Sequence, residues 1–341
     1  MESVRALKEQ DSLSKKEAKA DCPVCGAKEC RFLDHFRPYS DVDWTFDIFS
    51  CITCGARFAL RDPAIDYYDI LHTTEGSSYS PHYEMAATVR GFLENRRLDA
   101  CERYLKRAAQ KYGEVIDFIK KKRKPLSILE IGSTTGFMTA FLRGRGHEAE
   151  GIDISQRAIR YAQSTFGPFF SDRPSKAHYD LIFHLGLIGC LDQPRAFLKE
   201  TLTLLSEEGE MIFNAPNVKS AEELGELWVS TPPPDLVTLF HDGSFRAMVD
   251  EPFEVKVRKV DRWNEIVSKN TRTRWRLPYT HFPVSFVQQR SKGLNRMKPL
   301  VRRHLKTAWA GACRLIDLLG PLKRYESEYG LMVTIRRKRT L

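Results

Sequence analysis

One stretch, residues 126–155, constrains the fold of this chain more than any other, because its hydrophobic period changes twice. The short apolar run 126–131 stops at Gly132, a helical pattern follows over 137–144, and a second apolar run ends at Asp153. A change from a continuous to a helical period and back predicts a strand, a turn, a helix and a second strand, which together make a βαβ unit. The sequence therefore predicts an α/β fold built on a parallel sheet.

The turn after the first strand suits a nucleoside-type cofactor. It reads Glu130-Ile131-Gly132-Ser133-Thr134-Thr135-Gly136. Glycine permits a tight turn and a close ligand approach, and the N–H groups of the next helix can face the polar part of a ligand. Asp153 ends the second strand, about 20 residues further on, where an acidic residue binds ribose hydroxyls. Dinucleotide enzymes require G-x-G-x-x-G, which this turn lacks. A plain glycine-capped strand–turn–helix is the structural alternative.

The Glu-x-Gly-x-x-x-Gly arrangement, followed by Gly-x-Asp at the second strand end, resembles class I S-adenosylmethionine (SAM) methyltransferases. The resemblance implies a Rossmann-like sheet with helices on both faces and SAM as the cofactor, with one acidic residue near the methionine ammonium and the other at the ribose. The implied cofactor-binding residues are Glu130, Gly132, Ser133, Thr134, Gly136, Asp153 and Ile154. The family usually has a further glycine where this chain has Thr134.

Segments beyond this unit agree with the same fold. Periodicity predicts helices over 155–162, 195–205 and 244–249, strands over 169–170, 179–184, 211–213, 253–260 and 330–335, and a turn at 207–209. The series over 179–217 resembles the methyltransferase subgroup that often carries an N-terminal zinc ribbon and has some members that modify sugars. Two positions depart from that subgroup: Gly189-Cys190 replaces its Glu-His pair, and Asp235 stands near the place of a further histidine.

Four of the eight cysteines form two Cys-x-x-Cys pairs, each followed by glycine. Cys22, Cys25, Cys51 and Cys54 can supply four thiolates to one ion. A zinc ribbon with a structural Zn²⁺ is expected, because a closed four-thiolate site has no open coordination position. A redox pair is the alternative, but it would not need two such motifs.

We expect six parts along the chain: a disordered tail over 1–20, the zinc ribbon over 21–60, a tyrosine-rich connector and helical lid over 61–124, the SAM-binding core over 125–260, a basic helical insertion over 261–328, and the last core strand with a tail over 329–341. The start lacks the apolar segment of a signal peptide, and no stretch reaches the ~18 apolar residues of a membrane span. A cytoplasmic protein without a transmembrane segment is expected.

Positive charge is concentrated at the C-terminal end. From Val255 onward there are 22 Lys and Arg against 5 Asp and Glu, a net of +17, whereas the whole chain carries +10. Apolar residues repeat at helical spacing over 294–319, with Lys and Arg between them. Such a helix can lie on an anionic membrane, so peripheral membrane contact is one expectation. The same charges can bind phosphates of a substrate, or the helix can pack on the core with its charges in water.

The basic run 120–124 before Pro125 can touch nucleic acid or simply be a solvated helix end.

The resemblance implies methyl transfer from SAM to a small-molecule or glycan-type acceptor, which the charge leads us to expect to be phosphate-bearing or lipid-linked. A hydroxyl acceptor needs a general base. The catalytic candidates are His184, at the end of the fourth strand and facing the cleft, and His241, with Tyr83 as a weaker third. A structural role is the alternative for each histidine.

Two other functions compete with this one. The first is a methyltransferase-like binding or scaffold protein that no longer turns over. The second is a nucleic-acid methyltransferase, and nucleic acid is not the expected partner because no Asn-Pro-Pro-Tyr or Asp-Pro-Pro-Tyr sequence follows the fourth strand.

Overall fold

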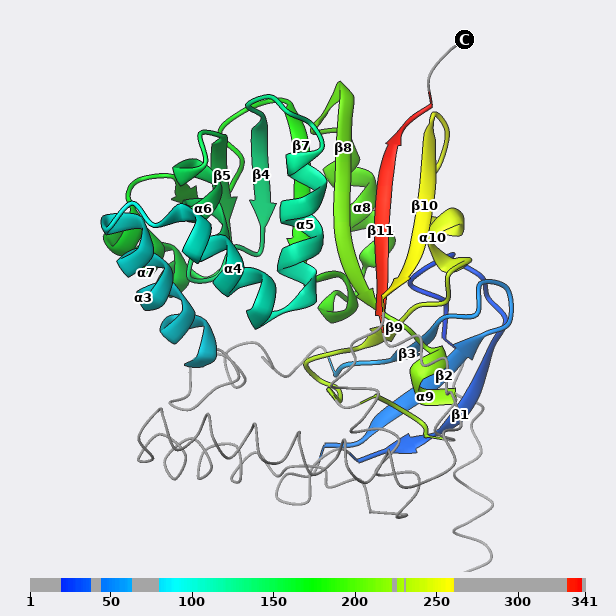
Figure 1. Ribbon diagram of the computed structural model, residues 1–341. Helices are drawn as coiled ribbons and strands as arrows, with labels where there is room; N and C mark the ends of the chain where they lie inside the picture. Colours follow the sequence, from blue (N-terminus) through cyan, green and yellow to red (C-terminus); the bar gives the residue numbers. More distant parts are fainter. Residues whose placement is uncertain are drawn as a thin grey trace, which may run out of the picture.

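The computed structural model describes residues 20–37, 44–62, 80–222, 226–229, 231–260 and 330–338. This part contains a seven-stranded sheet in the order β10-β11-β8-β7-β4-β5-β6 and a four-stranded sheet in the order β1-β2-β3-β9 (Figure 1). The large sheet consists of β4 (Ser127–Ile131), β5 (Glu148–Ile152), β6 (Phe170–Ser171), β7 (Tyr179–Leu185), β8 (Leu205–Pro216), β10 (Phe253–Val260) and β11 (Gly330–Arg337). The small sheet consists of β1 (Cys30–Phe36), β2 (Phe46–Cys51), β3 (Arg57–Ala59) and β9 (Thr238–Leu239).

The large sheet confirms the expected α/β, Rossmann-like architecture. Strands β8, β7, β4, β5 and β6 run parallel to one another. The last two strands of the chain add an antiparallel pair, because β11 lies antiparallel to β8 and β10 antiparallel to β11. The central strand β4 is buried along most of its length, as expected for a strand that helices cover on both faces.

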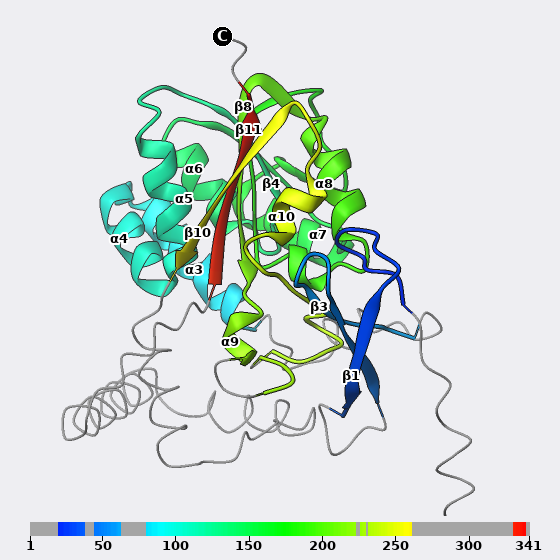
Figure 2. The same cartoon turned by 90° about the vertical axis from the view of Figure 1, so that its right-hand side faces the viewer.

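Helices cover the large sheet on both faces (Figure 2). One face carries α3 (Ser80–Glu94), α4 (Leu98–Ala108), α5 (Gln110–Lys120) and α6 (Phe137–Gly144). The other face carries α8 (Pro194–Leu202) and α10 (Ser244–Met248). Helix α7 (Gln156–Phe166) packs beside β6. Two shorter pieces are the 3₁₀ turn η1 (Ile188–Cys190) and α9 (Lys219–Glu222). The expected helical region before β4 is thus three helices. A left-handed residue, Arg96 (φ 54), and an extended one, Ala109 (φ −155), separate them.

Strand β8 differs from its prediction. The turn expected at 207–209 is an irregular stretch inside a longer strand, Leu205–Pro216. Tyr179 of β7 pairs with Leu205, but Leu181 pairs with Glu210, so the residues between belong to a bulge. Gly209 fits there because an added Cβ would lie 2.7 Å from the carbonyl oxygen of Tyr179.

The small sheet is not an independent unit. Its fourth strand, β9, comes from the segment after β8 and pairs with β3. One continuous apolar cluster contains Val24, Phe49 and Phe58 of the N-terminal region together with Ile182 and Phe213 of the large sheet. The N-terminal region therefore packs onto the α8 and α10 face of the large sheet and shares its core.

Both ends of the long connection between β10 and β11 lie at one place. Val260, the last residue of β10, pairs with Gly330, the first of β11, and Gly330 also pairs with Pro216 at the carboxyl end of β8. The chain therefore leaves and re-enters the sheet at the edge where the parallel strands end. The predicted insertion over 261–328 lies outside the described residues, as does the tail over 1–19.

Candidate cofactor site and metal centre

The turn after β4 has the backbone conformation that its sequence predicts. Gly132 (φ 73) and Gly136 (φ 77) are left-handed, and Thr134 (φ 49) is left-handed as well. Glycine adopts this region without a penalty, whereas a residue with a Cβ does so rarely. Thr134 therefore occupies a backbone conformation that glycine would adopt without strain. The N–H groups of Gly132 and Ser133 donate to the carbonyl of Ile152, at 2.8 and 3.0 Å, and hold the turn against the end of β5.

Asp153 lies directly beside this turn. Its Oδ2 accepts the N–H of Thr134 at 2.9 Å, and its Oδ1 accepts the N–H of Ser155 at 2.9 Å. The side chain is mostly buried, and this burial raises the pKa of its carboxyl group. The next residue, Ile154, is 78% exposed. The end of β5 thus presents a carboxylate fixed by two backbone donors and an apolar side chain facing water.

Glu130, at the end of β4, ties the strand to the helix that follows. Its Oε2 accepts the N–H of Thr139 at 2.9 Å and the hydroxyl of Thr139 at 2.5 Å. The first bond satisfies a backbone donor in the first turn of α6, which has no partner within the helix. Burial raises the pKa of Glu130 to about 8. A cationic group of a ligand would stabilise the ionised form of such a buried carboxyl group.

Two glycines near the turn are fixed by packing. A Cβ on Gly136 would lie 2.5 Å from the ring of Phe170 and 2.9 Å from Ala162, and a Cβ on Gly151 would lie 2.6 Å from Ser133. A Cβ on Gly132 would meet only Leu187, at 3.6 Å, which is an ordinary contact. Gly136 and Gly151 are therefore required by their neighbours, whereas Gly132 is required only by its backbone angle.

The two predicted catalytic histidines do not meet at this turn. His184 is fully buried, stacks on Phe213 at 4.5 Å between ring centroids, and contacts Phe197 of α8 at 5.4 Å. Neither of its ring nitrogens has a hydrogen-bond partner within the described part of the chain. Burial lowers its pKa to about 3, so the ring is neutral. The expectation that His184 faces the cleft is wrong, because its position on β7 points it into the core beneath α8.

His241 lies beside the N-terminal region instead. Its Nδ1 is 2.6 Å from the Asp242 carboxylate and accepts the N–H of Gly243 at 3.2 Å. Its side chain also lies close to Gly55, because a Cβ added to Gly55 would be 3.1 Å from the Cβ of His241. Tyr83, the weaker candidate, packs edge-on against Tyr161 of α7 at 4.6 Å. Catalysis by either residue stays a prediction.

Sequence reasoning gave no role to the pair that does come together near the end of β7. The Sγ of Cys190 lies 4.0 Å from Oδ1 of Asp235. Both residues stand at positions where the chain departs from the zinc-ribbon subgroup pattern. These two departures were the sequence signal that could have pointed to the pair.

The structure brings together the four predicted metal ligands. The sulfur atoms of Cys22, Cys25, Cys51 and Cys54 all lie within 4.8 Å of one another. Cys22 and Cys54 are 3.7 Å apart, and Cys25 and Cys51 are 3.5 Å apart. Four sulfurs at ~2.3 Å from a tetrahedral zinc ion would be roughly 3.8 Å from one another. The donor set and its spacing therefore fit zinc.

The two cysteine turns have the same backbone geometry. The N–H of Cys22 donates to Ala27 at 2.9 Å, and the N–H of Cys51 donates to Ala56 at 2.8 Å. The glycine after each pair is left-handed, with φ 77 at Gly26 and φ 72 at Gly55. A hydrogen bond from the Cys54 thiol lowers the pKa of Cys22 and so favours its thiolate form.

Both turns are bonded to helices of the large sheet. Arg195 of α8 donates to the carbonyl of Cys25 at 3.2 Å, and the hydroxyl of Ser244 in α10 donates to the carbonyl of Cys54 at 3.0 Å. The four-cysteine cluster is therefore fixed to the face of the sheet opposite α3 to α6.

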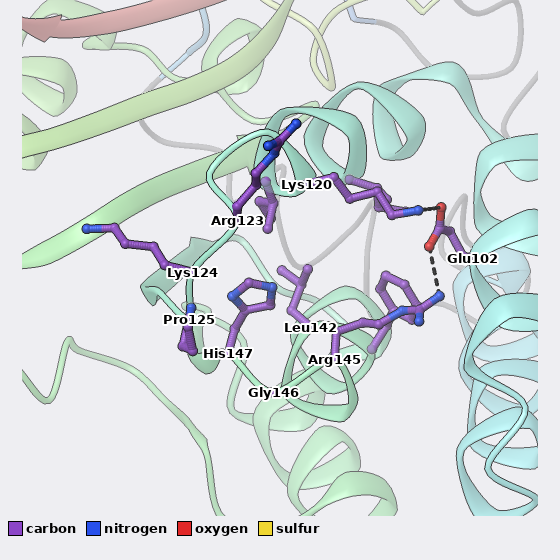
Figure 3. Close-up of a pocket in the computed structure, with 12 residues that line it drawn as sticks. Glu102, Lys120, Arg123, Lys124, Pro125, Leu142, Arg145, Gly146 and His147 are labelled. Carbon is purple, nitrogen blue, oxygen red and sulfur yellow. Dashed lines mark hydrogen bonds and ion pairs between the residues drawn. The ribbon is translucent and has the colours of Figure 1, made fainter.

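A cavity of about 330 Å³ opens at the other edge of the sheet, where β4 begins and α6 ends. Figure 3 shows Lys120 and Arg145 pointing toward Glu102, to which they bond at 2.6 and 2.8 Å. Lys122 of the same basic run pairs with Glu210. Because this cavity lies at the amino ends of the parallel strands, it is not the predicted cofactor site, and two charges of the run serve to join α5 to neighbouring elements.

Residues 95–251 match the family model of a methyltransferase domain. This region extends from the end of α3 to the residues before β10 and contains both the glycine turn and Asp153. No curated protein matches the chain. None of the described helices is long and apolar enough to cross a membrane.

Two solved structures illustrate the likeness. The plantazolicin methyltransferase BpumL in complex with S-adenosylhomocysteine (SAH) is 16% identical, with a TM-score of 0.34, and the match covers 77% of this chain and 92% of that one. The magnesium protoporphyrin IX methyltransferase ChlM from Synechocystis PCC 6803, with bound SAH, is 16% identical, with a TM-score of 0.37, and the match covers 52% of this chain and 94% of that one.

Proposed function

We propose that this protein is a SAM-dependent methyltransferase. The observation that carries the proposal is the bond between the N–H of Thr134 and the Asp153 carboxylate, at 2.9 Å. It places an acidic group against a glycine turn at the carboxyl ends of two adjacent parallel strands, β4 and β5. Nucleoside-type cofactors bind at this edge of an open α/β sheet. The match of residues 95–251 to a methyltransferase domain agrees with it.

In this proposal, each part of SAM would be bound by a group near the turn. Asp153 would bind the ribose hydroxyls, and the exposed side chain of Ile154 would be covered by the adenine ring. Glu130 would stabilise the methionine ammonium, because a cation offsets the cost of ionising a buried carboxyl group. The backbone of the turn from Gly132 to Gly136 would contact the rest. SAM, when bound, supplies an electrophilic methyl group, and most of the protein's work is to position the acceptor.

Calorimetric titration with SAH tests this function. Asp153→Ala removes hydrogen bonds to a charged group, so we expect binding to weaken by about 1.5–3 kcal/mol, or roughly ten- to a hundredfold. Asp172→Ala is the matched control, because Asp172 is an exposed carboxylate just beyond β6, and it should bind SAH like the wild type. Absence of both heat and thermal shift with the wild type would leave the non-catalytic scaffold as the better explanation.

The acceptor in this proposal is a small or glycan-type molecule that carries phosphate or a lipid. It is supported by the +17 charge after Val255 and by the position of the β10–β11 connection, which starts and ends at the carboxyl edge. Sedimentation with neutral and anionic vesicles at low and high salt separates the two versions. Salt-sensitive binding to anionic vesicles, lost in Arg302/Arg303/Lys306→Ala, favours the lipid-linked acceptor and peripheral membrane contact; no sedimentation favours a soluble phosphate-bearing one.

The zinc ribbon of this proposal has a structural role. Four thiolates at tetrahedral spacing leave no position for a substrate. A thiolate site also needs reduced cysteines, which favours the cytoplasm as its compartment. A nucleic-acid acceptor is the remaining alternative, and labelled methyl transfer to total RNA or DNA would establish it.

A further inference from the structure

A thiol and a carboxylate from separate segments meet beyond the end of β7. Cys190 ends η1, and its Sγ lies 3.4 Å from the carbonyl of Gly186 and 4.0 Å from Oδ1 of Asp235. Asp235 belongs to the segment that leads from β8 to β9. The N–H of Val237 donates to the carbonyl of Gly189 at 2.8 Å, which joins this segment to η1.

In the described part of the chain, the Asp235 carboxylate lacks a strong hydrogen-bond donor. Within the ranges that the structure describes, the thiol of Cys190 is its hydrogen-bond partner, and a thiol at 4.0 Å is a weak donor. Arg61 does not fill this role, because its guanidinium donates to the carbonyls of Pro234 and Asp235 and to the carboxylate of Asp192. Burial raises the pKa of Asp235. A half-buried carboxylate in this state is stabilised by any ligand that brings an O–H or N–H group.

The same loop touches the cofactor turn. Leu187 packs against Gly132, with its Cδ2 3.6 Å from the place of a Cβ there. On its other side, the Nζ of Lys111 lies 3.3 Å from the place of a Cβ on Gly186. The positive charge of Lys111 acts on both Glu130 and Cys190, but burial outweighs it and raises the pKa of each. The thiol–carboxylate pair is therefore on the carboxyl edge, next to the turn that would hold the cofactor.

We propose that Asp235 takes the proton from the methyl acceptor, and that the reacting atom of the acceptor is therefore a neutral hydroxyl oxygen or amine nitrogen. This inference rests on the proposed function. As the acceptor atom bonds to the methyl carbon, its O–H or N–H bond gives its proton to Asp235, and the carbon–sulfur electron pair returns to sulfur. The charge is balanced, because the sulfonium becomes a neutral thioether and the carboxylate a neutral acid.

Neither predicted histidine competes for this role. His184 is fully buried between two phenylalanine rings, and His241 contacts Gly55 in the cysteine turn. Arg61 and Gly189 position Asp235. Arg61 holds the backbone on either side of the carboxylate, and a Cβ on Gly189 would lie 2.5 Å from Leu236. The acceptor side of the site is thus attached to the N-terminal region through Arg61.

The first test needs no acceptor. We would measure alkylation of Cys190 by N-ethylmaleimide against pH, following the Cys190 peptide by mass spectrometry, with Cys190→Ser as the blank. Asp235→Asn removes a negative neighbour, so the alkylation profile should move to lower pH. Asp192→Asn is the control, because Asp192 also contacts Arg61 but is largely exposed, and it should not produce that shift. Identical profiles for the wild type and Asp235→Asn would refute the contact between the pair.

The second test separates proton transfer from cofactor binding. Wild type and Asp235→Asn would be titrated with SAH, then incubated with methyl-labelled SAM and a small-molecule cell extract as the acceptor source. We expect SAH affinities within about twofold and label transfer at least about a hundredfold slower in Asp235→Asn, the scale of general-base catalysis. Asp235→Glu should recover part of the rate.

Each remaining outcome has a distinct meaning. Normal transfer by Asp235→Asn overturns the inference and leaves the methyltransferase function intact. No SAH binding by the wild type overturns the function itself. SAH binding without transfer to any extract component also overturns the inference and favours the scaffold.

Discussion

At the scale of single residues, the turn requires its two glycines for different reasons. Gly132 is required by its backbone angle alone, and Gly136 by its backbone angle and by close packing. Gly132→Ala adds a Cβ with room beside Leu187 but keeps φ 73, whereas Gly136→Ala adds the same strain and a 2.5 Å overlap with Phe170. We expect a stability loss of about 1–3 kcal/mol from strain at Gly132 and a further loss of about 1–3 kcal/mol from overpacking at Gly136. Urea denaturation of both variants measures the difference, and equal midpoints would contradict it.

Glu130 gives a residue-scale prediction in pH. Its folded-state pKa is about 8 against an ordinary value of 4.5, so the folded state binds the proton more tightly than the unfolded state. This stabilisation is complete below pH ~4.5 and is lost as the pH rises toward ~8. Relative to Glu130→Gln, the unfolding free energy of the ligand-free wild type should fall across this window. If the unfolding free energies of the two proteins changed with pH in parallel, the carboxyl group of Glu130 would not be protonated in the folded state and the prediction would be wrong.

At the scale of elements, the geometry of the cysteine turns predicts which sulfur atoms bind zinc and which do not. Cys30 starts β1 opposite Cys51, but it is not one of the four residues whose sulfurs gather. Burial raises its pKa to about 12, which keeps it a thiol. Cys51→Ser should therefore lose zinc, while Cys30→Ser should keep about one ion per chain. Metal analysis of the two purified variants decides this, and equal zinc content would remove the four-thiolate assignment.

At the scale of the whole molecule, the N-terminal region and the large sheet share one apolar cluster. The ribbon is further joined by β9 pairing with β3 and by the bonds from Arg195 and Ser244 to the cysteine turns. We expect zinc removal by a chelator to lower the melting temperature in a single cooperative transition, because elements with a common core unfold together. Calorimetry in which the ribbon melts alone and the sheet transition stays unchanged would mean that the two are separate domains.

Local patterns in the sequence determined the elements and the four candidate metal ligands. A strand ends where a glycine follows an apolar run, and a helix appears where the period becomes 3.6, so the βαβ unit around Gly132 could be predicted from neighbours alone. The spacing of the two Cys-x-x-Cys pairs is equally local, because each turn needs only its own glycine. The strands β10 and β11 were also predicted from their local patterns, but their antiparallel pairing was not.

Contacts between distant segments were decided only by the tertiary structure. Strand alternation places His184 on one face or the other, and which face is buried beneath α8 depends on packing rather than on the strand itself. The pairing of β9 with β3 and the meeting of Cys190 with Asp235 join segments far apart in the chain. No local period encodes such a contact, because its energy comes from burial that exists only once both segments are in place.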